Sequence, residues 1–444
     1  MKKLLLLIAA LMLAACCETE KSPKPKYVFF FIGDGMGFNA VALTQATRAA
    51  SKGDIGFAPL NFSSFPVAGY ATTNAGTRLV TCSAAAGTAL ATGHKTSINT
   101  IGMTADHSAP LKSVAVGAKE MGYRTGVITS VSIDHATPAS FYAHVPDRGM
   151  AYEIGKWAAK AGLDLYGGGG FVDTTGKDGV ERDLYEILAD SGYVVARGDF
   201  PLKGEKAIIT QAEGKNPSSL PYAIDRQEDD LSLAQITRRS IEFLYGGDEG
   251  AAGFFLMVEG GQIDWAGHGN DGATIVREVE DMAEAMEAAL EFYNAHPDET
   301  LIVVTADHET GGASIGNASN GYDTDLGMLR MQKISKGKLN EELSAAQNWD
   351  EAQRILSEKI GFNAHGDIMK TLGSGLEMIY RNDRKELGNE AARILNRKAG
   401  VGWTTGAHTA AFVPVYAIGA GAQEFAGSQD NTDIPRKIFR LMER

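Results

Sequence analysis

Residues 27–37 read YVFFFIGDGMG, an apolar run that ends at Gly33 and is followed at once by an aspartate between glycines. A continuous apolar run rich in Phe, Val and Ile is typical of a strand buried on both faces of a parallel sheet. Similar runs recur at 126–131, 253–260, 301–306 and 411–419. Amphipathic stretches between them predict helices around 113–121, 182–191, 232–245 and 273–294. The alternation predicts an α/β fold, a three-layer α/β/α sandwich around a largely parallel central sheet.

Two segments interrupt this alternation. Residues 195–230 hold few apolar runs and several Gly, Pro and Asp residues, which predicts a loop-rich excursion. Residues 316–400 are rich in Glu, Lys and Arg, with helix-like stretches near 339–359 and 383–398. We therefore expect a catalytic domain formed by residues 27–315 and 401–444, with a mainly helical insertion at 316–400 near the active face.

The charge balance restricts the partners of the chain. Its 444 residues include 42 basic and 55 acidic side chains, for a net charge of −13. A surface of that sign repels phosphate backbones, so nucleic acid is not expected as a partner. The three cysteines are too few for a disulfide scaffold.

The N-terminus predicts export. Two lysines precede LLLLIAALMLAA, which has the length of a secretory signal and is too short to span a bilayer comfortably. We predict a signal peptide over residues 1–15, a lipobox that leaves a lipidated Cys16, and a polar tether over 16–26. The alternative is an ordinary signal peptide cut near Ala15. We expect an exported, periplasmic or cell-surface lipoprotein that contacts the membrane only through its anchor.

Polar side chains follow three of the predicted strands. In open parallel sheets, ligands bind beyond the carboxyl ends of the strands, so these segments can converge on one metal site. Asp264 and His268, four residues apart, would project to the same side of a helical turn, a spacing suited to a shared cation. The candidates are Asp34 after the first strand, Glu259, Asp264 and His268 after the strand at 253–258, Asp307 and His308 after the strand at 301–306, and His408 before the last strand.

Ser83 stands at the start of a predicted helix. The Ala-rich residues 84–91 favour helix and Gly93 ends it. One interpretation is that Ser83 only caps the helix. The other is that its hydroxyl lies where helix N–H groups favour phosphate, with a metal that makes it a nucleophile.

Six blocks of sequence together resemble the alkaline phosphatases. They occur in family order and span residues 28–420, outside the excursion and the insertion. The blocks are IGDGMG at 32–37, TCSAAAGTALATGHKT at 81–96, HATPASFYAHV at 135–145, VEGGQIDWAGH at 258–268, TADHETGG at 305–312 and GWTTGAHT at 402–409.

This resemblance implies two zinc ions and a neighbouring magnesium-type site. Asp264, His268 and His408 would hold the first zinc. Asp34, Asp307 and His308 would hold the second, which faces the nucleophile Ser83. Asp34, Thr137 and Glu259 would hold the third metal, magnesium with cobalt as the alternative. Arg148, in the block AHVPDRG, would grip phosphate oxygens with its guanidinium.

Three positions depart from the pattern of many relatives. Cys82 replaces an acidic residue that helps to hold the arginine. His135 and Trp265 stand where some relatives have Asp and Lys, and we expect them beside the ligands, with an effect on which metal the third site takes. Cys82 does not indicate a sulfatase, whose motif needs Pro and Arg at the positions of Ala84 and Ala86.

The resemblance implies a phosphate monoester hydrolase that acts through a phosphoserine. The sequence leaves the oligomeric state open, with a homodimer as one candidate because relatives are often dimers. Two alternatives are kept: a phosphodiesterase or another ester hydrolase of the same superfamily, and a non-catalytic surface lipoprotein that captures phosphate.

Overall fold

The computed structural model describes residues 24–198, 202, 204–246, 251–361 and 368–444. The predicted signal peptide over 1–15, the lipidated Cys16 and most of the tether lie outside the described residues, so these features stay predictions. Within the described ranges, no helix combines the length and the apolar character needed to cross a bilayer.

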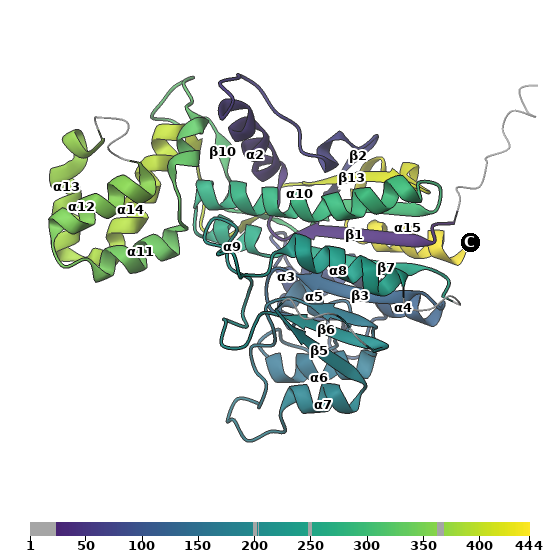
Figure 1. The fold of residues 1–444 in the computed structure, drawn as a ribbon. Helices are drawn as coiled ribbons and strands as arrows, with labels where there is room; N and C mark the ends of the chain where they lie inside the picture. The colour runs from purple at the N-terminus through teal and green to yellow at the C-terminus, as the bar shows by residue number, and fades with distance from the viewer. Residues whose placement is uncertain (1–23, 199–201, 203, 247–250, 362–367) are drawn as a thin grey trace, which may run out of the picture.

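A ten-stranded sheet forms the centre of the protein (Figure 1). Its strand order is β14-β2-β13-β8-β1-β7-β3-β4-β6-β5. The strands are β1 (Tyr27–Gly33), β2 (Val67–Thr72), β3 (Arg124–Thr129), β4 (Leu165–Gly167), β5 (Tyr193–Arg197), β6 (Lys206–Thr210), β7 (Phe254–Gly260), β8 (Thr300–Ala306), β13 (Val413–Gly419) and β14 (Gly427–Asp430). β13 pairs antiparallel with both neighbours, whereas the other strand pairs of this sheet are parallel. The largely parallel sheet is confirmed.

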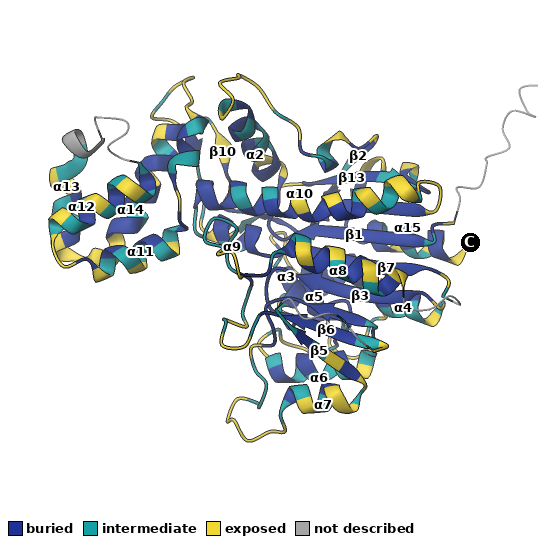
Figure 2. Ribbon diagram, in the orientation of Figure 1, coloured by how far each residue is buried: buried dark blue, intermediate teal, exposed yellow. Residues whose placement is uncertain are grey.

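Helices cover the sheet on both sides, as the burial pattern requires (Figure 2). Every residue of β1, β7 and β8 is buried, so neither face of these strands meets water. On one side α10 (Gly272–Ala295) packs with α2 (Phe38–Ala50), α8 (Leu233–Tyr245) and α9 (Gln262–His268). On the other, α15 (Asp433–Glu443) packs with α3 (Ser83–Thr92) and α4 (Val114–Glu120), and α3 also contacts α5 (Ala136–Ala139). Near the β5 edge lie α6 (Ala151–Ala161) and α7 (Leu184–Asp190). The predicted α/β fold class is confirmed.

Four further helices stand beyond one end of the sheet (Figure 1). They are α11 (Lys336–Ala345), α12 (Trp349–Ile360), α13 (Ile368–Asn382) and α14 (Arg384–Ala399). The chain leaves and re-enters the body of the protein through a short antiparallel pair, β10 (Ser314–Ile315) with β11 (Val401–Gly402). In the sequence, these helices are therefore an insertion between β8 and β13 whose two ends pair as β10 and β11.

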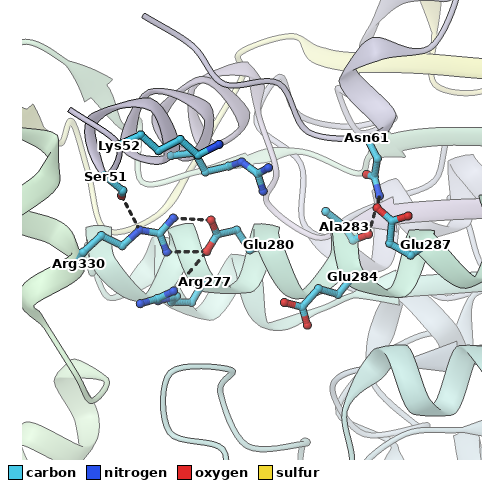
Figure 3. Close-up of a pocket in the computed structure, with 10 residues that line it drawn as sticks. Ser51, Lys52, Asn61, Arg277, Glu280, Ala283, Glu284, Glu287 and Arg330 are labelled. Atoms are coloured by element: carbon cyan, nitrogen blue, oxygen red, sulfur yellow. Dashed lines mark hydrogen bonds and ion pairs between the residues drawn. The ribbon is translucent and has the colours of Figure 1, made fainter. Parts of the chain in front are cut away.

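A 3₁₀ turn, η2 (Leu326–Met331), ties this segment to the body (Figure 3). The Arg330 guanidinium forms a two-pronged ion pair with Glu280 of α10, and its Nε donates to Ser51 Oγ at 3.2 Å. A planar guanidinium held by both oxygens of a carboxylate fixes direction as well as distance. The contact therefore fixes the position of η2 against α10.

The structure differs from the sequence prediction in three places. The excursion at 195–230, expected to be loop-rich, contributes β5 and β6 to the sheet edge. The stretch at 339–359 is split between α11 and α12, and α13 was not predicted. Finally, Cys82 is the residue before the first turn of α3, so Ser83 is its first helical residue and not its N-cap.

Candidate active site

Three adjacent strands bring the candidate ligands to one edge of the sheet. β1 lies between β7 and β8, and Gly33 is in register with Gly260 on one side and Ala306 on the other. Asp34 and Asp307 therefore leave the sheet at the same level, and α9 begins there too. The segments predicted to converge do so.

The first group joins α9 to the loop before β13. Asp264 Oδ1 lies 3.4 Å from His268 Nε2 and 3.5 Å from His408 Nε2. His408 reaches this position because β12 (His408–Thr409) pairs with β9 (Glu309–Thr310) directly after β8. The structure therefore brings together Asp264, His268 and His408.

The two imidazoles of this group are oriented for a cation. His268 Nδ1 donates to the Gly406 carbonyl at 2.7 Å, and His408 Nδ1 donates to the Thr81 carbonyl at 2.9 Å. Carbonyls only accept, so in the neutral rings each Nε2 carries a lone pair. These two Nε2 atoms are 3.1 Å apart. Two facing lone pairs repel unless a cation lies beside both, and backbone contacts of this kind orient metal-binding histidines.

The second group surrounds His308 and reaches Ser83. His308 Nε2 lies 3.4 Å from Asp34 Oδ1 and 3.2 Å from Asp307 Oδ2. The same nitrogen lies 3.3 Å from Ser83 Oγ. All three ligand candidates are fully buried. The hydroxyl at the start of α3 therefore faces a closed set of two carboxylates and one imidazole.

The third group contains one member more than the three predicted. Asp34, Glu259 and His135 each offer a donor atom within 4.8 Å of the others. Thr137 Oγ1 lies 3.4 Å from Asp34 Oδ2. His135, expected only beside the ligands, is thus a candidate ligand itself, and the Trp265 ring meets it edge to face.

Electrostatics within these groups favour bound cations. Burial first, then the charges of neighbouring carboxylates, raises the pKa of Asp34 well above its usual range. Burial likewise raises the pKa of Asp307 to about 7 and of Glu259 to about 8. Asp34 Oδ1, Asp307 Oδ2 and Glu259 Oε1 are buried without a hydrogen-bond partner. Orphaned oxygens on crowded carboxylates are costly without a counter-charge, so the donor set fits divalent cations.

Burial has the opposite effect on the imidazoles. It lowers the pKa of His308 well below its usual range, and it also lowers the pKa of His408. Both rings are therefore neutral near pH 7, the form in which imidazole binds a metal.

Arg148 is held by a residue that sequence reasoning did not pair with it. Its Nη2 donates to His135 Nε2 at 3.0 Å. Cys82 Sγ instead accepts from the Asn99 backbone N–H at 3.2 Å, and the Asn99 carbonyl accepts from Arg148 N–H at 2.8 Å. In this structure the Arg148 guanidinium is therefore held by His135 and not by Cys82.

Two threonines also support the ligands and were missed. Thr310 Oγ1 donates to Asp264 Oδ1 at 2.5 Å and lies 3.2 Å from His308 Nδ1. Thr129 Oγ1 donates to Glu259 Oε2. Thr310 stands after a predicted strand, in the block TADHETGG, which was the available signal, whereas Thr129 lies within a predicted strand and carried no signal.

Comparisons with known proteins agree with this arrangement. A family model described as alkaline phosphatase matches residues 25–164 and 176–443. Alkaline phosphatase 3 of Bacillus subtilis (strain 168) is 34% identical over 430 residues, 94% of this chain and 89% of the relative. The cold-active alkaline phosphatase of the psychrophile Shewanella sp. has a TM-score of 0.81 at 30% identity, covering 94% of this chain and 100% of that one.

A third comparison concerns a variant of the alkaline phosphatase from the Antarctic bacterium TAB5. In it a histidine is replaced by aspartate and Mg is bound in the M3 site. It has a TM-score of 0.68 at 26% identity and covers 95% of this chain and 99% of that one. From the family model and these relatives together, the chain belongs to the alkaline phosphatase family and is a phosphatase, a hydrolase of phosphate monoesters.

Proposed function

We propose that the protein hydrolyses phosphate monoesters through a phosphoserine on Ser83, at a centre of two zinc ions and one magnesium-type ion. The observation that carries the proposal is the position of Ser83 Oγ, 3.3 Å from the His308 nitrogen that also faces Asp34 and Asp307. A buried hydroxyl at this place meets the ligand set directly. A helix cap would need no such neighbours.

The donor sets support the choice of metals. Asp264, His268 and His408 would hold one zinc, and Asp34, Asp307 and His308 the other, because imidazole with carboxylate suits zinc. The third group, with Glu259 and Thr137, is richer in oxygen and suits magnesium. His135 adds a nitrogen to this group, which would also suit cobalt.

When bound, these cations would lower the pKa of the Ser83 hydroxyl and stabilise the negative charge on the departing oxygen. Ser83 Oγ lies at the first turn of α3, where backbone N–H groups have no acceptor within the helix and can bind phosphate oxygens. Arg148, oriented by His135, adds two parallel donors for the non-bridging oxygens. The chain's own groups thus orient the phosphorus toward Oγ.

The proposed reaction takes place in two steps. Ser83 Oγ forms a bond to phosphorus while the bond to the alcohol oxygen breaks, and the hydroxyl proton passes to solvent as the alkoxide takes one up. Water then attacks the phosphorus of phosphoserine, the Oγ–P bond breaks, and Ser83 regains its proton. The sum is one monoester and one water converted to alcohol and inorganic phosphate.

The test compares Ser83→Ala with Cys82→Ser, a change at the neighbouring residue. Ser83→Ala should lower turnover of p-nitrophenyl phosphate by orders of magnitude while elemental analysis shows unchanged metal content. Acid quench followed by peptide mass spectrometry should find phosphate on Ser83 in the wild type and in Cys82→Ser. If Ser83→Ala turned over substrate as fast as the wild type, or if the phosphate were found on another residue, the covalent mechanism would be overturned. Preference for bis-p-nitrophenyl phosphate over the monoester would favour the diesterase alternative.

A further inference from the structure

A cavity of about 470 Å³ lies between one face of α14 and the loops that flank the first ligand group. The α14 face contributes Asn389, Arg393 and Arg397. The opposite wall contributes Asn270 and Trp403. The cavity therefore lies between the four-helix segment at 336–399 and the part of the chain that carries His268 and His408.

The cavity wall is continuous with the ligand group. Gly269, which lines the cavity, directly follows His268. The Gly269 carbonyl accepts from Lys336 Nζ, at the start of α11, at 2.5 Å. The Asn270 amide, oriented by its hydrogen-bond partners, donates to the Thr405 carbonyl at 2.9 Å. Thr405 precedes Gly406, which accepts from His268. The chain segments next to His268 and His408 thus form one wall of this cavity.

Trp403 lies between the cavity and the turn at Gly311, which follows the candidate ligands Asp307 and His308. A Cβ on Gly311 would lie 2.7 Å from the indole ring, so only glycine lets the ring sit this close. Gly311 follows Thr310, the residue that donates to Asp264. The indole Nε1 is buried, so the ring can offer the cavity its aromatic surface but not its N–H. The ring is therefore a rigid aromatic wall.

The remaining lining is polar. Arg393 is engaged by Glu390 through two hydrogen bonds of 2.6 Å. Within the described part of the chain, no ion pair or side-chain hydrogen bond engages the guanidinium of Arg397, which is half-buried. Ser319 and Asn389 add a hydroxyl and an amide, while Ala392 and Val401 are the aliphatic residues of the lining. A flat aromatic wall with amide and guanidinium donors matches a compact molecule with many hydroxyls.

We propose that this cavity binds the alcohol portion of phosphate monoesters whose alcohol is polyhydroxylated, that is, sugar phosphates. Arg397 donates to the hydroxyls and Trp403 lies against the sugar ring. The inference rests on the proposed function, because it places the leaving group on the side of His268 and His408. It assigns the four-helix segment a role in substrate selection.

The test uses two monoesters with primary alkoxide leaving groups, glucose 6-phosphate and ethyl phosphate. Wild type should show a kcat/KM about 10-fold or more higher for the sugar ester, since hydrogen bonds to a charged donor are worth about that factor. Arg397→Ala should remove most of this preference and change ethyl phosphate hydrolysis less than about two-fold. Lys398→Ala is the matched control: it is a basic residue in the same last turn of α14 but does not line the cavity.

Trp403→Leu removes the flat aromatic wall, so it should lower kcat/KM for the sugar ester alone. Equal kcat/KM for the two esters in wild type would overturn the inference. An equal loss for both esters in Arg397→Ala, or a preference for adenosine 5′-monophosphate over glucose 6-phosphate, would also overturn it. In each of these cases monoester hydrolysis persists and the proposed function stands. A wild-type protein that hydrolyses neither ester would instead contradict the proposed function.

Discussion

Replacing Glu278 with glutamine should stabilise the protein at high pH and leave it unchanged at low pH. Glu278 lies on α10, buried with 3% of its surface exposed, and its Oε1 accepts from the Ala223 N–H at 2.7 Å. Burial, and next the charge of Asp281, raise its pKa to about 8 from 4.5. A glutamine oxygen can keep the bond to Ala223. The substitution thus removes the titration and preserves the contact.

The sign follows from the direction of the shift. Between pH 4.5 and about 8 the folded protein holds a proton on Glu278 that the unfolded chain has lost. The free energy of unfolding therefore falls as pH rises through this window, by about 1.4 kcal/mol for each pH unit. From pH 5 to pH 9 the titration of Glu278 lowers the free energy of unfolding of the wild type by about 4 kcal/mol. The glutamine variant does not lose this stability. With an unfolding entropy of about 2.1 cal/mol/K per residue, this corresponds to about 4 °C in Tm.

The assay is thermal unfolding of the metal-loaded proteins at pH 5, 7 and 9. The Tm of Glu278→Gln relative to wild type should rise across this series. Glu242→Gln, at an exposed position on α8, is the control and should track wild type throughout. A Tm difference that is the same at pH 5 and pH 9 would refute the reasoning, as would a glutamine variant less stable than wild type at pH 9.

Two further substitutions test the supports of the site and of the helical segment. Thr310→Val removes the donor to Asp264 at nearly constant volume and should lower metal affinity about 10- to 100-fold, measured by chelator titration; metal retention equal to wild type would contradict it. Arg330→Met removes the half-buried pair with Glu280 and should lower Tm by about 1 °C, roughly 1 kcal/mol, whereas Arg381→Met, at an exposed pair, should change it less. Equal shifts in the two variants would mean that the Glu280 contact carries no special weight.

The central strands could be predicted because burial on both faces leaves a continuous apolar run. The run at 27–33 coincides with β1, and that at 301–306 with nearly all of β8. Edge strands carry no such signal: only Tyr193 and Ala196 of the five residues of β5 are buried, and the strand runs into sequence that reads as loop. The reversed direction of β13 could not be predicted either, since an apolar run specifies burial and not polarity.

Six candidate ligands could be proposed because each follows a strand or stands one helical turn from another ligand, whereas the roles of His408 and Thr137 came from the resemblance. Contacts between distant loops could not. The Arg148–His135 hydrogen bond depends on how the loop after α5 folds back, and both residue types are common in loops. The cavity at Trp403 depends on how α14 packs against the ligand loops, a contact between segments that no local pattern specifies.

With its proposed cations bound, the site would carry a charge opposite in sign to that of the whole chain. The net charge of −13 would repel a phosphate dianion, and so would the four candidate carboxylates, which contribute −4. Three divalent cations would contribute +6 and Arg148 one more, for a local total of +3. Burial is the first cause of the raised pKa of three of these carboxylates, Asp34, Glu259 and Asp307. Affinity for the metals and affinity for the phosphate would therefore have one source: buried carboxylates, three of them with an oxygen that lacks a hydrogen-bond partner, whose charge bound cations would reverse.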